Sequence, residues 1–340
     1  MTHHLNRRRI LAFAAAGGGA CMFGAPSAWA ITNDLLNASF STTTQFYNGY
    51  DAFFAANRQK STGTAPKIRV SYGASGAQAR AVMEGLPADV VTLAVAWDID
   101  AIAKRGLIAP NWQSRLPDNA TPYASTVVFL VRQGNPKQIK DWDDLIRPDV
   151  QIAVPNPKTS GGARWDVLAA WSYALRKYGG VAGARSYLQK FFANVPVLSP
   201  STHDTTLNFT QRGIGDVLVG LECEAFEAIR QAGAKFEMIA PSLSIRAESP
   251  VAVVDKNVDR RGTRALAQAY LEQLYSPGAQ EIAAQSFFRP VDQTILNKYA
   301  HQFPAIDMVT IDTAFGGWAK AQATFFANGG IFDQIYAKGV

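Results

Sequence analysis

Cysteine is scarce in this sequence. Its 340 residues contain only Cys21 and Cys223, and Cys21 lies in an N-terminal segment that we expect to be removed. One remaining cysteine excludes an internal disulfide and a cysteine-rich metal site. We therefore expect Cys223 to be a small, buried apolar residue.

Catalytic signatures are also missing. The sequence contains no GxSxG, no HExxH and no GxxxxGK[ST] phosphate-binding loop. Beyond the N-terminal segment, His203 and His301 are too far apart in sequence to indicate a metal site or a catalytic pair. We predict that the chain is not an enzyme and that it uses no catalytic residue, no metal and no cofactor.

The first thirty residues predict an export signal. A basic head at 7–9 precedes the apolar run ILAFAAAGGGACMFG, and small residues follow in SAWA, which ends at Ala30. The run is too short and too rich in glycine to span a bilayer. The arginines are compatible with a twin-arginine route or with the general secretory route, and either would deliver the protein to the periplasm.

Removal of this segment lowers the formal net charge from +6 to +3, because it carries three arginines and no acid. The rest of the chain has no cluster or stripe of lysine and arginine. We therefore expect no nucleic-acid partner.

Short apolar runs alternate with longer helical patterns along the chain, which predicts an α/β fold. Strands that are apolar on both faces and alternate with helices indicate largely parallel sheets covered on both sides. The predicted strands are 67–73, 88–96, 126–134, 150–157, 215–222 and 251–256, and the predicted helices are 42–60, 77–86, 163–180 and 183–195.

Two strand-like runs, near 125–136 and 248–256, are places where the chain would cross between two lobes. We predict lobe 1 from residues 31–124 and 255–340, and lobe 2 from residues 125–254. Two crossings make a hinge with a cleft between the lobes. Open α/β sheets bind ligands beyond the carboxyl ends of their strands, where helices begin.

The stretch PNPKTSGGARW, at 155–165, predicts an unusual helix start. Ser160 offers a hydroxyl, while Gly161, Gly162 and Ala163 offer backbone N–H groups that no bulky side chain shields. The first N–H groups of a helix lack an internal partner and carry partial positive charge. Such a start holds an anion without a cationic side chain, although an ordinary serine cap followed by flexible glycines has the same sequence.

Three further helix starts are equally rich in hydroxyls and small residues: SYGASGAQARAV, ASFSTTTQFY and SPSTHDTTLNF. Two of the four starts fall in each predicted lobe, so together they favour a cleft that encloses one anion. A dianion without protons needs donors only. A protonated anion also needs an acceptor, and leaving its proton unpaired costs about 1–3 kcal/mol. This chemistry favours sulfate.

Long segments resemble the periplasmic sulfate-binding proteins, the receptors of ABC sulfate importers. The resemblance covers nearly all of the chain after the export signal and includes ADVVTLAVAWDIDAIAKRG, NWQSRLPDNATPY, PNPKTSGGARWDVLAAW and SPGAQEIAAQSFFRP. It implies a two-lobed periplasmic-binding-protein fold of type II and a monomeric receptor. Such a receptor captures sulfate with uncharged donors and delivers it to a membrane permease.

The resemblance also implies binding residues. The family's Ser-Gly-Gly falls on Ser160, Gly161 and Gly162, and its serine loop falls on Ser75 and Gly76, with an alanine at 74 in place of a glycine. To the residues that the resemblance implies we add Ala163, whose backbone N–H follows that of Gly162. The predicted ligand-binding residues are Ser160, Gly161, Gly162, Ser75, Ser41, Thr202, Gly76, Ala163, His203 and Leu221.

Three of these positions depart from the family pattern. Ser41 stands where the family has aspartate, Thr202 stands where it has a small residue, and Leu221 replaces a tryptophan whose indole donates to sulfate. Thr202, Thr205 or His203 would have to supply the missing donor. The alternative is a receptor for another oxyanion, namely thiosulfate, molybdate or phosphate.

Other interpretations stay open at this point. A sulfatase or phosphatase would need a catalytic set that the sequence lacks, and a sensor that serves no importer has the same sequence features as a receptor. His203 also fits a solvated loop residue. We expect Glu222 and Glu224, near Leu221, to be solvated carboxylates. The alternative is that they border the cleft, with Arg164 or Arg212 as counter-ions.

Overall fold

The computed structural model describes residues 33–233 and 235–336. The predicted export signal, residues 1–30, lies outside the described residues. Within the described part, no helix is both long enough and apolar enough to cross a membrane.

The smaller of two sheets has the strand order β10-β3-β1-β2. Its members β1 (Asp34–Phe40), β2 (Lys67–Gly73) and β3 (Val90–Thr92) are parallel, and β10 (Val251–Val253) runs antiparallel at the edge. Phe40 lies opposite Gly73, and Ser39 lies opposite Thr92. The three parallel strands therefore end together, and the segments that leave them start from one edge of the sheet.

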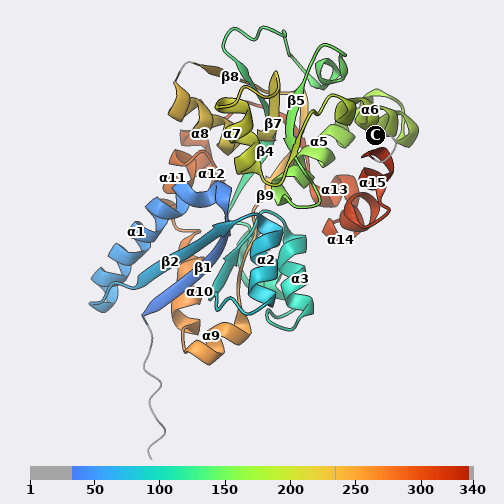
Figure 1. The fold of residues 1–340 in the computed structure, drawn as a ribbon. Helices are drawn as coiled ribbons and strands as arrows, with labels where there is room; N and C mark the ends of the chain where they lie inside the picture. The colour runs from blue at the N-terminus through green and yellow to red at the C-terminus, as the bar shows by residue number, and fades with distance from the viewer. Residues whose placement is uncertain (1–32, 234, 337–340) are drawn as a thin grey trace, which may run out of the picture. The chain divides into compact units, whose positions relative to one another are not determined.

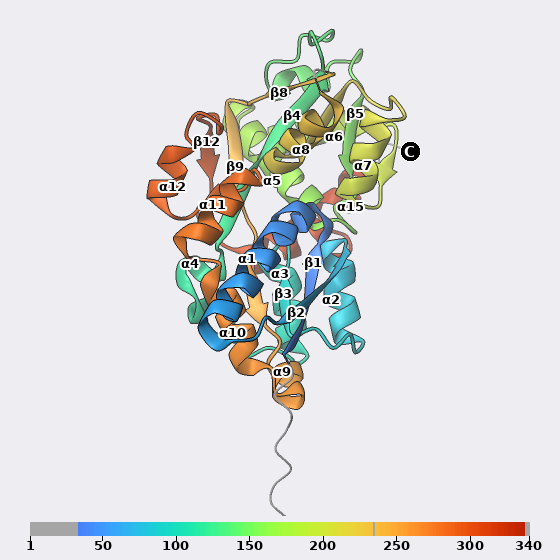
Figure 2. The same ribbon diagram turned by 90° about the vertical axis from the view of Figure 1, so that its left-hand side faces the viewer.

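Three helical segments follow these parallel strands directly. η1 (Ser41–Thr43) and α1 (Thr44–Thr62) follow β1, α2 (Ser75–Met83) follows β2, and α3 (Ala96–Lys104) follows β3. Figures 1 and 2 show them around the smaller sheet, with α9 and α10 nearby. The other elements near this sheet are η2 (Trp112–Arg115), α4 (Pro117–Ala120), α9 (Asp255–Arg261) and α10 (Arg264–Gln273).

The larger sheet has the order β12-β9-β4-β7-β5-β6, and β8 and β11 also pair with its long central strand β4. Its strands are β4 (Tyr123–Arg132), β5 (Ile152–Pro155), β6 (Leu198–Ser199), β7 (Val217–Leu221), β8 (Phe236–Ile239), β9 (Leu243–Glu248), β11 (Arg289–Pro290) and β12 (Asp307–Val309).

The prediction of largely parallel sheets is wrong for the larger sheet. β4 runs antiparallel to β7, β8, β9 and β11, whereas the pairs β5–β6, β5–β7 and β9–β12 are parallel. A strand that is apolar on both faces has the same sequence pattern in either direction. The pattern of β4 predicted its burial and carried no information on its direction.

Helix α5 (Gly161–Lys177) crosses the larger sheet and is buried along most of its length. The chain passes from the larger sheet to the smaller one between Glu248 and Val251, and β12 lies in the larger sheet. The lobe boundaries stay a prediction. The remaining elements are η3 (Trp142–Ile146), α6 (Val181–Ala193), α7 (Thr202–Thr210), α8 (Glu222–Ala232), α11 (Pro277–Gln285), α12 (Gln293–Lys298), α13 (Ile311–Phe315), α14 (Trp318–Ala321), the π-helical turn η4 (Gln322–Phe326) and α15 (Ile331–Tyr336).

Candidate functional site

The four helix starts singled out in the sequence meet around one small cavity. The cavity has a volume of about 10 Å³, which is near the minimum for holding one water molecule. The smaller sheet and its helices supply about half of the lining, and the starts of α5 and α7 supply the rest. The lining residues are Phe40, Ser41, Gly73, Ala74, Ser75, Ala94, Ser160, Gly161, Gly162, Ser201 and Thr202.

The start of α5 presents free donors to this cavity. Ser160 is the N-cap, and its Oγ accepts a hydrogen bond of 3.4 Å from the N–H of Ala163. The helix supplies no partner for the N–H groups of Gly161 and Gly162. The Ser160 hydroxyl proton is not used in that cap bond. These three donors border the cavity together.

Both glycines are required by close packing. A Cβ on Gly161 would lie 3.0 Å from the Cβ atoms of Ser75 and Ala94, on the smaller sheet's side of the cavity. A Cβ on Gly162 would lie 2.6 Å from Cγ2 of Thr202. The bare backbone of α5 therefore lets its first turn contact two other helix starts directly.

Ser75 opens α2, and its hydroxyl is already engaged. It donates a 2.6 Å hydrogen bond to Oδ2 of Asp98 and accepts a 3.1 Å bond from the N–H of Ala94. The backbone N–H of Ser75, at the first position of α2, has no partner within the helix. Ser75 thus offers its N–H to the cavity, while its side chain fixes the local geometry.

The buried charges beside the cavity neutralise each other. Arg164 Nη1 lies 3.0 Å from Asp98 Oδ1, and Arg164 Nε donates to the carbonyl of Pro157. None of the lining residues is charged. An anion in the cavity would therefore be held by N–H and O–H dipoles rather than by a cationic side chain.

Ser41 and Thr202 complete the ring of helix starts. Ser41 begins η1 directly after β1, and Thr202 begins α7 after the N-cap Ser201. Ser201 Oγ accepts from the N–H of Asp204 at 3.1 Å, so the cap leaves the N–H of Thr202 without a partner in the helix. Ser41 contributes a hydroxyl and an N–H near the cavity. Thr202 contributes its N–H, because its hydroxyl interacts with Glu224.

Four of the predicted ligand-binding residues do not line this cavity. A Cβ on Gly76 would lie nearest to Arg80, Thr159 and Asp98, and the N–H of Ala163 is used by Ser160. The other two are Leu221 and His203. The list of predicted ligand-binding residues in turn omits five lining residues. Phe40, Gly73, Ala74 and Ser201 lie in the helix starts quoted from the sequence, whereas Ala94 lies in none of them.

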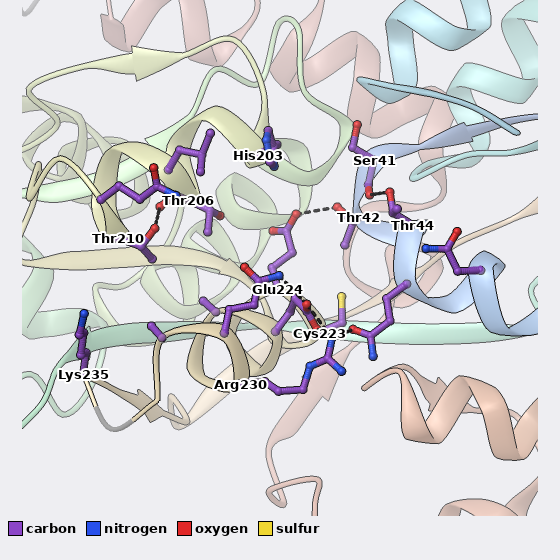
Figure 3. Close-up of a pocket in the computed structure, with 18 residues that line it drawn as sticks. Ser41, Thr42, Thr44, His203, Thr206, Thr210, Cys223, Glu224, Arg230 and Lys235 are labelled. Atoms are coloured by element: carbon purple, nitrogen blue, oxygen red, sulfur yellow. Dashed lines mark hydrogen bonds and ion pairs between the residues drawn. The ribbon is translucent and has the colours of Figure 1, made fainter.

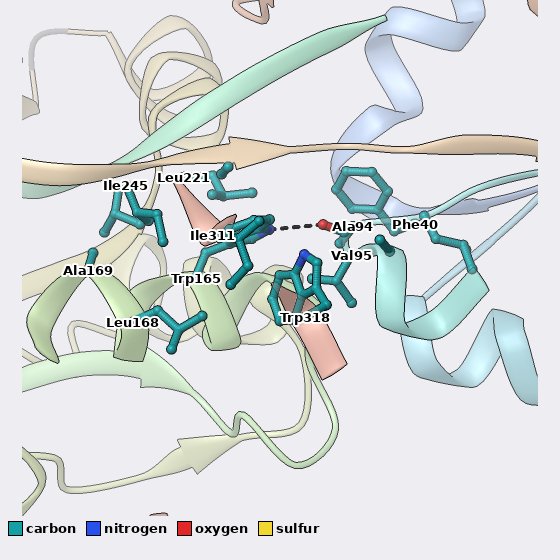
Figure 4. Packing of buried hydrophobic residues seen from close by; sticks show 14 of the residues in the cluster. Phe40, Ala94, Val95, Trp165, Leu168, Ala169, Leu221, Ile245, Ile311 and Trp318 are labelled. Carbon is teal, nitrogen blue, oxygen red and sulfur yellow. Dashed lines mark hydrogen bonds between the residues drawn. The ribbon is translucent and has the colours of Figure 1, made fainter. Parts of the chain in front are cut away.

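Leu221 lies in an apolar cluster and is 2% exposed. Figure 4 shows its side chain with Ile245 and Trp165, and it shows the Trp165 indole directed at Ala94. That indole donates a 2.9 Å hydrogen bond to the carbonyl of Ala94, which links α5 to the segment after β3. Thr205, one of the proposed replacement donors, instead donates to the carbonyl of Ser201.

A second and larger cavity, of about 640 Å³, lies between the start of α1 and helices α7 and α8 (Figure 3). Ser41 borders both cavities. His203 lines the larger one as an exposed residue of α7, not of a loop. Thr42 Oγ1 donates a 2.6 Å hydrogen bond across this cavity to Glu224 Oε1.

The expectation that Glu222 and Glu224 are solvated is wrong. Glu222 is fully buried and forms two hydrogen bonds, of 2.7 and 2.8 Å, with Arg289. Glu224 is partly buried against Thr42. Cys223 between them is buried, as expected, and burial raises the pKa of its thiol. In the described ranges, no group of three or more metal-binding side chains comes together.

The fold and this site define a solute-binding protein. The model of a family described as "Bacterial extracellular solute-binding protein" matches residues 44–289. The chain belongs to this family.

Individual relatives are similar over almost their whole length. The chain is 54% identical to a sulfate-binding protein of Salmonella typhimurium, over 88% of this chain and 92% of that protein. It is 44% identical to a thiosulfate-binding protein of Pseudomonas aeruginosa, over 97% of this chain and 99% of that protein. The solved structure of the sulfate-binding protein SubI from Mycobacterium tuberculosis is 30% identical, with a TM-score of 0.78, over 85% of this chain and 98% of that one. The predicted periplasmic-binding-protein fold and the resemblance to sulfate-binding proteins are both confirmed.

Proposed function

We propose that this protein captures sulfate in the periplasm and delivers it, as a monomer, to the permease of an ABC importer. Relatives named sulfate-binding protein at 51–54% identity support the choice of anion. Membership of an extracellular solute-binding family supports a location outside the cytoplasm. The delivery step is the role that such a receptor has in an importer.

The observation that carries the proposal is the donor set of the small cavity. The hydroxyl of Ser160 and the N–H groups of Gly161, Gly162, Ser75 and Thr202 belong to three helix starts that line this one small cavity. The N–H of Ser41, at the start of η1, adds a donor from a fourth helix start. We assign the sulfate contacts to these six residues.

The donor set also favours sulfate over phosphate. Every group that we assign is an N–H donor or a hydroxyl, and no carboxylate lines the cavity. A hydrogen phosphate would bury its proton beside donors, at a cost of about 1–3 kcal/mol. Thiosulfate has no such proton, and it is the ligand named for relatives at 40–44% identity. The higher identity to sulfate-binding relatives favours sulfate over thiosulfate as well.

The test is direct binding to the chain without its export signal. Residues 31–340 are unfolded and refolded to remove carried-over ligand, then titrated by calorimetry with sulfate, thiosulfate, molybdate and phosphate. We expect tight binding of sulfate and no binding of phosphate. A tighter rival anion would contradict the proposed ligand while leaving the fold and the cavity intact.

A pair of serine caps provides the matched control for the site. Ser160→Ala removes a hydroxyl that we assign to sulfate, and it should weaken binding by about ten- to a hundredfold, which corresponds to about 1.5–3 kcal/mol. Ser276→Ala removes the same kind of N-cap, at the start of α11, and should leave the affinity unchanged. Equal effects of the two changes would show that Ser160 acts through helix stability alone.

A further inference from the structure

Two hydrogen bonds join the η1–α1 segment, beside the smaller sheet, to helix α8, beside the larger sheet. Thr42 Oγ1 donates a 2.6 Å bond to Glu224 Oε1, and Arg230 Nη2 donates a 2.6 Å bond to Gln45 Oε1. η1 follows directly after β1, whereas α8 follows directly after β7. Both bonds therefore connect elements that leave different sheets, and all four residues line the larger cavity (Figure 3).

The bond between Thr42 and Glu224 lies beside the anion cavity. Thr42 is next in sequence to Ser41, which borders the anion cavity as well as the larger one. At the other end of the bond, Glu224 also interacts with the hydroxyl of Thr202, which lines the anion cavity. Helix α7, which begins at Thr202, contacts both η1 and α8. Glu224 is thus linked to two of the helix starts that surround the anion cavity.

The length of this bond is that of a strong interaction. A hydroxyl oxygen that donates to an ionised carboxylate typically lies about 2.5–2.7 Å from it, and such bonds are roughly twice as strong as those between neutral groups. An ionised carboxylate accepts and does not donate, so the proton of the Thr42 hydroxyl is used by Glu224. Thr42 does not line the anion cavity. Its side chain therefore acts on an anion only through the position of η1.

The N–H donors of the anion cavity come from both sides of it. Ser41 offers its N–H from the smaller sheet's side, and Thr202 offers its N–H from the start of α7. Without an anion, these helix starts direct partial positive charges toward one shared space, which favours their separation. A bound anion attracts both. Approach of the two sides is therefore linked to binding, and a contact made only in the close arrangement adds to the affinity.

We propose that Thr42 and Glu224 form a clasp, made when the anion is bound, which positions the N–H groups of Ser41 and Thr202 around it. Thr42 and Glu224 are positioning residues, because they act on the anion through the neighbouring backbone. The inference rests on the proposed function, since it requires an anion in the small cavity. It adds to that function the pair of side chains that determines how long the anion is held.

A bond that only stabilised the fold would behave differently. It would be present with and without the anion, so its loss would lower the unfolding free energy of both forms equally. The affinity would then stay unchanged, because affinity depends only on the difference between the two forms. Loss of the clasp should instead lower the affinity and leave the anion-free protein as stable as before.

The experiment compares two substitutions of Thr42 in the protein without its export signal. Thr42→Val keeps the branched shape and removes the hydroxyl. It should weaken sulfate binding about five- to fiftyfold, because the lost bond has a charged acceptor and is partly buried. Thr42→Ser keeps the hydroxyl and should bind as the unchanged protein does. Calorimetry measures the affinities, and stopped-flow kinetics should show the loss mainly as faster dissociation.

Thr210→Val is the matched control. Thr210 also lines the larger cavity, but its hydroxyl donates to the carbonyl of Thr206 within α7. This variant should bind sulfate as the unchanged protein does. Denaturant unfolding without anion should show no greater loss of stability in Thr42→Val than in Thr210→Val.

A double-mutant cycle identifies the partner of Thr42. In the Glu224→Ala background, the further change Thr42→Val should have little effect on the affinity, because the acceptor of the hydroxyl is already gone. A full additional loss in that background would contradict the clasp. If Glu224→Ala does not fold, the comparison of Thr42→Val with Thr42→Ser decides.

Three results would overturn the clasp while leaving the proposed function in place. These are tight binding by Thr42→Val, equal losses in Thr42→Val and Thr42→Ser, and equal losses in Thr42→Val and Thr210→Val. If another anion of the panel binds more tightly than sulfate, the same comparison is made with that anion, so failure of the sulfate assignment leaves this test available. If no anion binds to the unchanged protein, the proposed function and the clasp both fail.

Discussion

Arg164 on α5 and Asp98 on α3 form a buried ion pair, with Nη1 of the arginine 3.0 Å from Oδ1 of the aspartate. The two residues come from helices attached to different sheets, so the pair ties the two sides of the anion cavity together. The other carboxyl oxygen of Asp98 accepts the hydroxyl of Ser75. One ion pair therefore orients a helix start and neutralises the strongest charges near it.

Removing one partner of this pair should be costly. Asp98→Asn leaves Arg164 as a buried cation without a counter-charge, which typically costs about 3–5 kcal/mol of stability. The exposed pair of Arg69 and Asp34, with nitrogen and oxygen 2.7 Å apart, is the control, because Asp34→Asn should cost less than about 1 kcal/mol. Denaturant unfolding of both variants measures the difference, and equal losses would argue against a structural role for the buried pair.

Gly161→Ala should separate anion binding from folding. Its new Cβ would lie 3.0 Å from Ser75 and Ala94 on the opposite side of the cavity, and overpacking of this kind costs about 1–3 kcal/mol. We expect sulfate affinity to fall by about five- to a hundredfold, with a smaller loss of unfolding free energy, because the two sides can move apart. Gly76→Ala, whose Cβ would have its nearest contact at 3.8 Å, should bind sulfate as before.

Gly162 and Thr202 should show strong coupling. In Gly162→Ala the new Cβ would lie 2.6 Å from Cγ2 of Thr202, so that side chain or α7 must shift and binding should weaken at least tenfold. Thr202→Ser removes the methyl group and keeps the hydroxyl, so the double variant should recover most of the affinity. A double-mutant cycle by calorimetry measures this coupling, and additive losses would contradict the packing account.

Asp51 should make stability depend on pH. Burial raises its pKa to about 6, although the Tyr270 hydroxyl donates a 2.6 Å hydrogen bond to it. Because the folded-state pKa exceeds that of the unfolded chain, the contribution of Asp51 is present at low pH and is lost as the pH rises from about 4 through about 6. The loss is at most about 3 kcal/mol. Asp51→Asn should remove this part of the pH dependence in unfolding experiments at pH 4 to 8.

The helix starts at the anion cavity were predictable because their signal is local. A residue with a hydroxyl, followed by small residues and then by apolar residues at helical spacing, predicts the start of α5. The same pattern predicted the starts of α2, η1 and α7. The reason for glycine at 161 was not predictable, since Ser75 and Ala94 approach it from distant parts of the sequence.

Long-range partners explain the remaining errors. In the sequence, Glu222 is an acidic residue at the start of a helix, a place where such residues are usually solvated. Its partner Arg289 lies 67 residues away and is brought to it only by the fold. The direction of β4 depends on which strands lie beside it, and its uniform apolar pattern does not encode them.

Capture of a dianion has a consequence for the whole molecule. The dipoles that hold it carry no net charge, and binding lowers the net charge of the molecule by two. Residues 31–340 carry a formal charge of +3, so one bound dianion leaves +1. The loaded and empty forms would therefore migrate differently in an electric field. A protein that binds this molecule would therefore contact a less positively charged partner in the ligand-bound form than in the empty form.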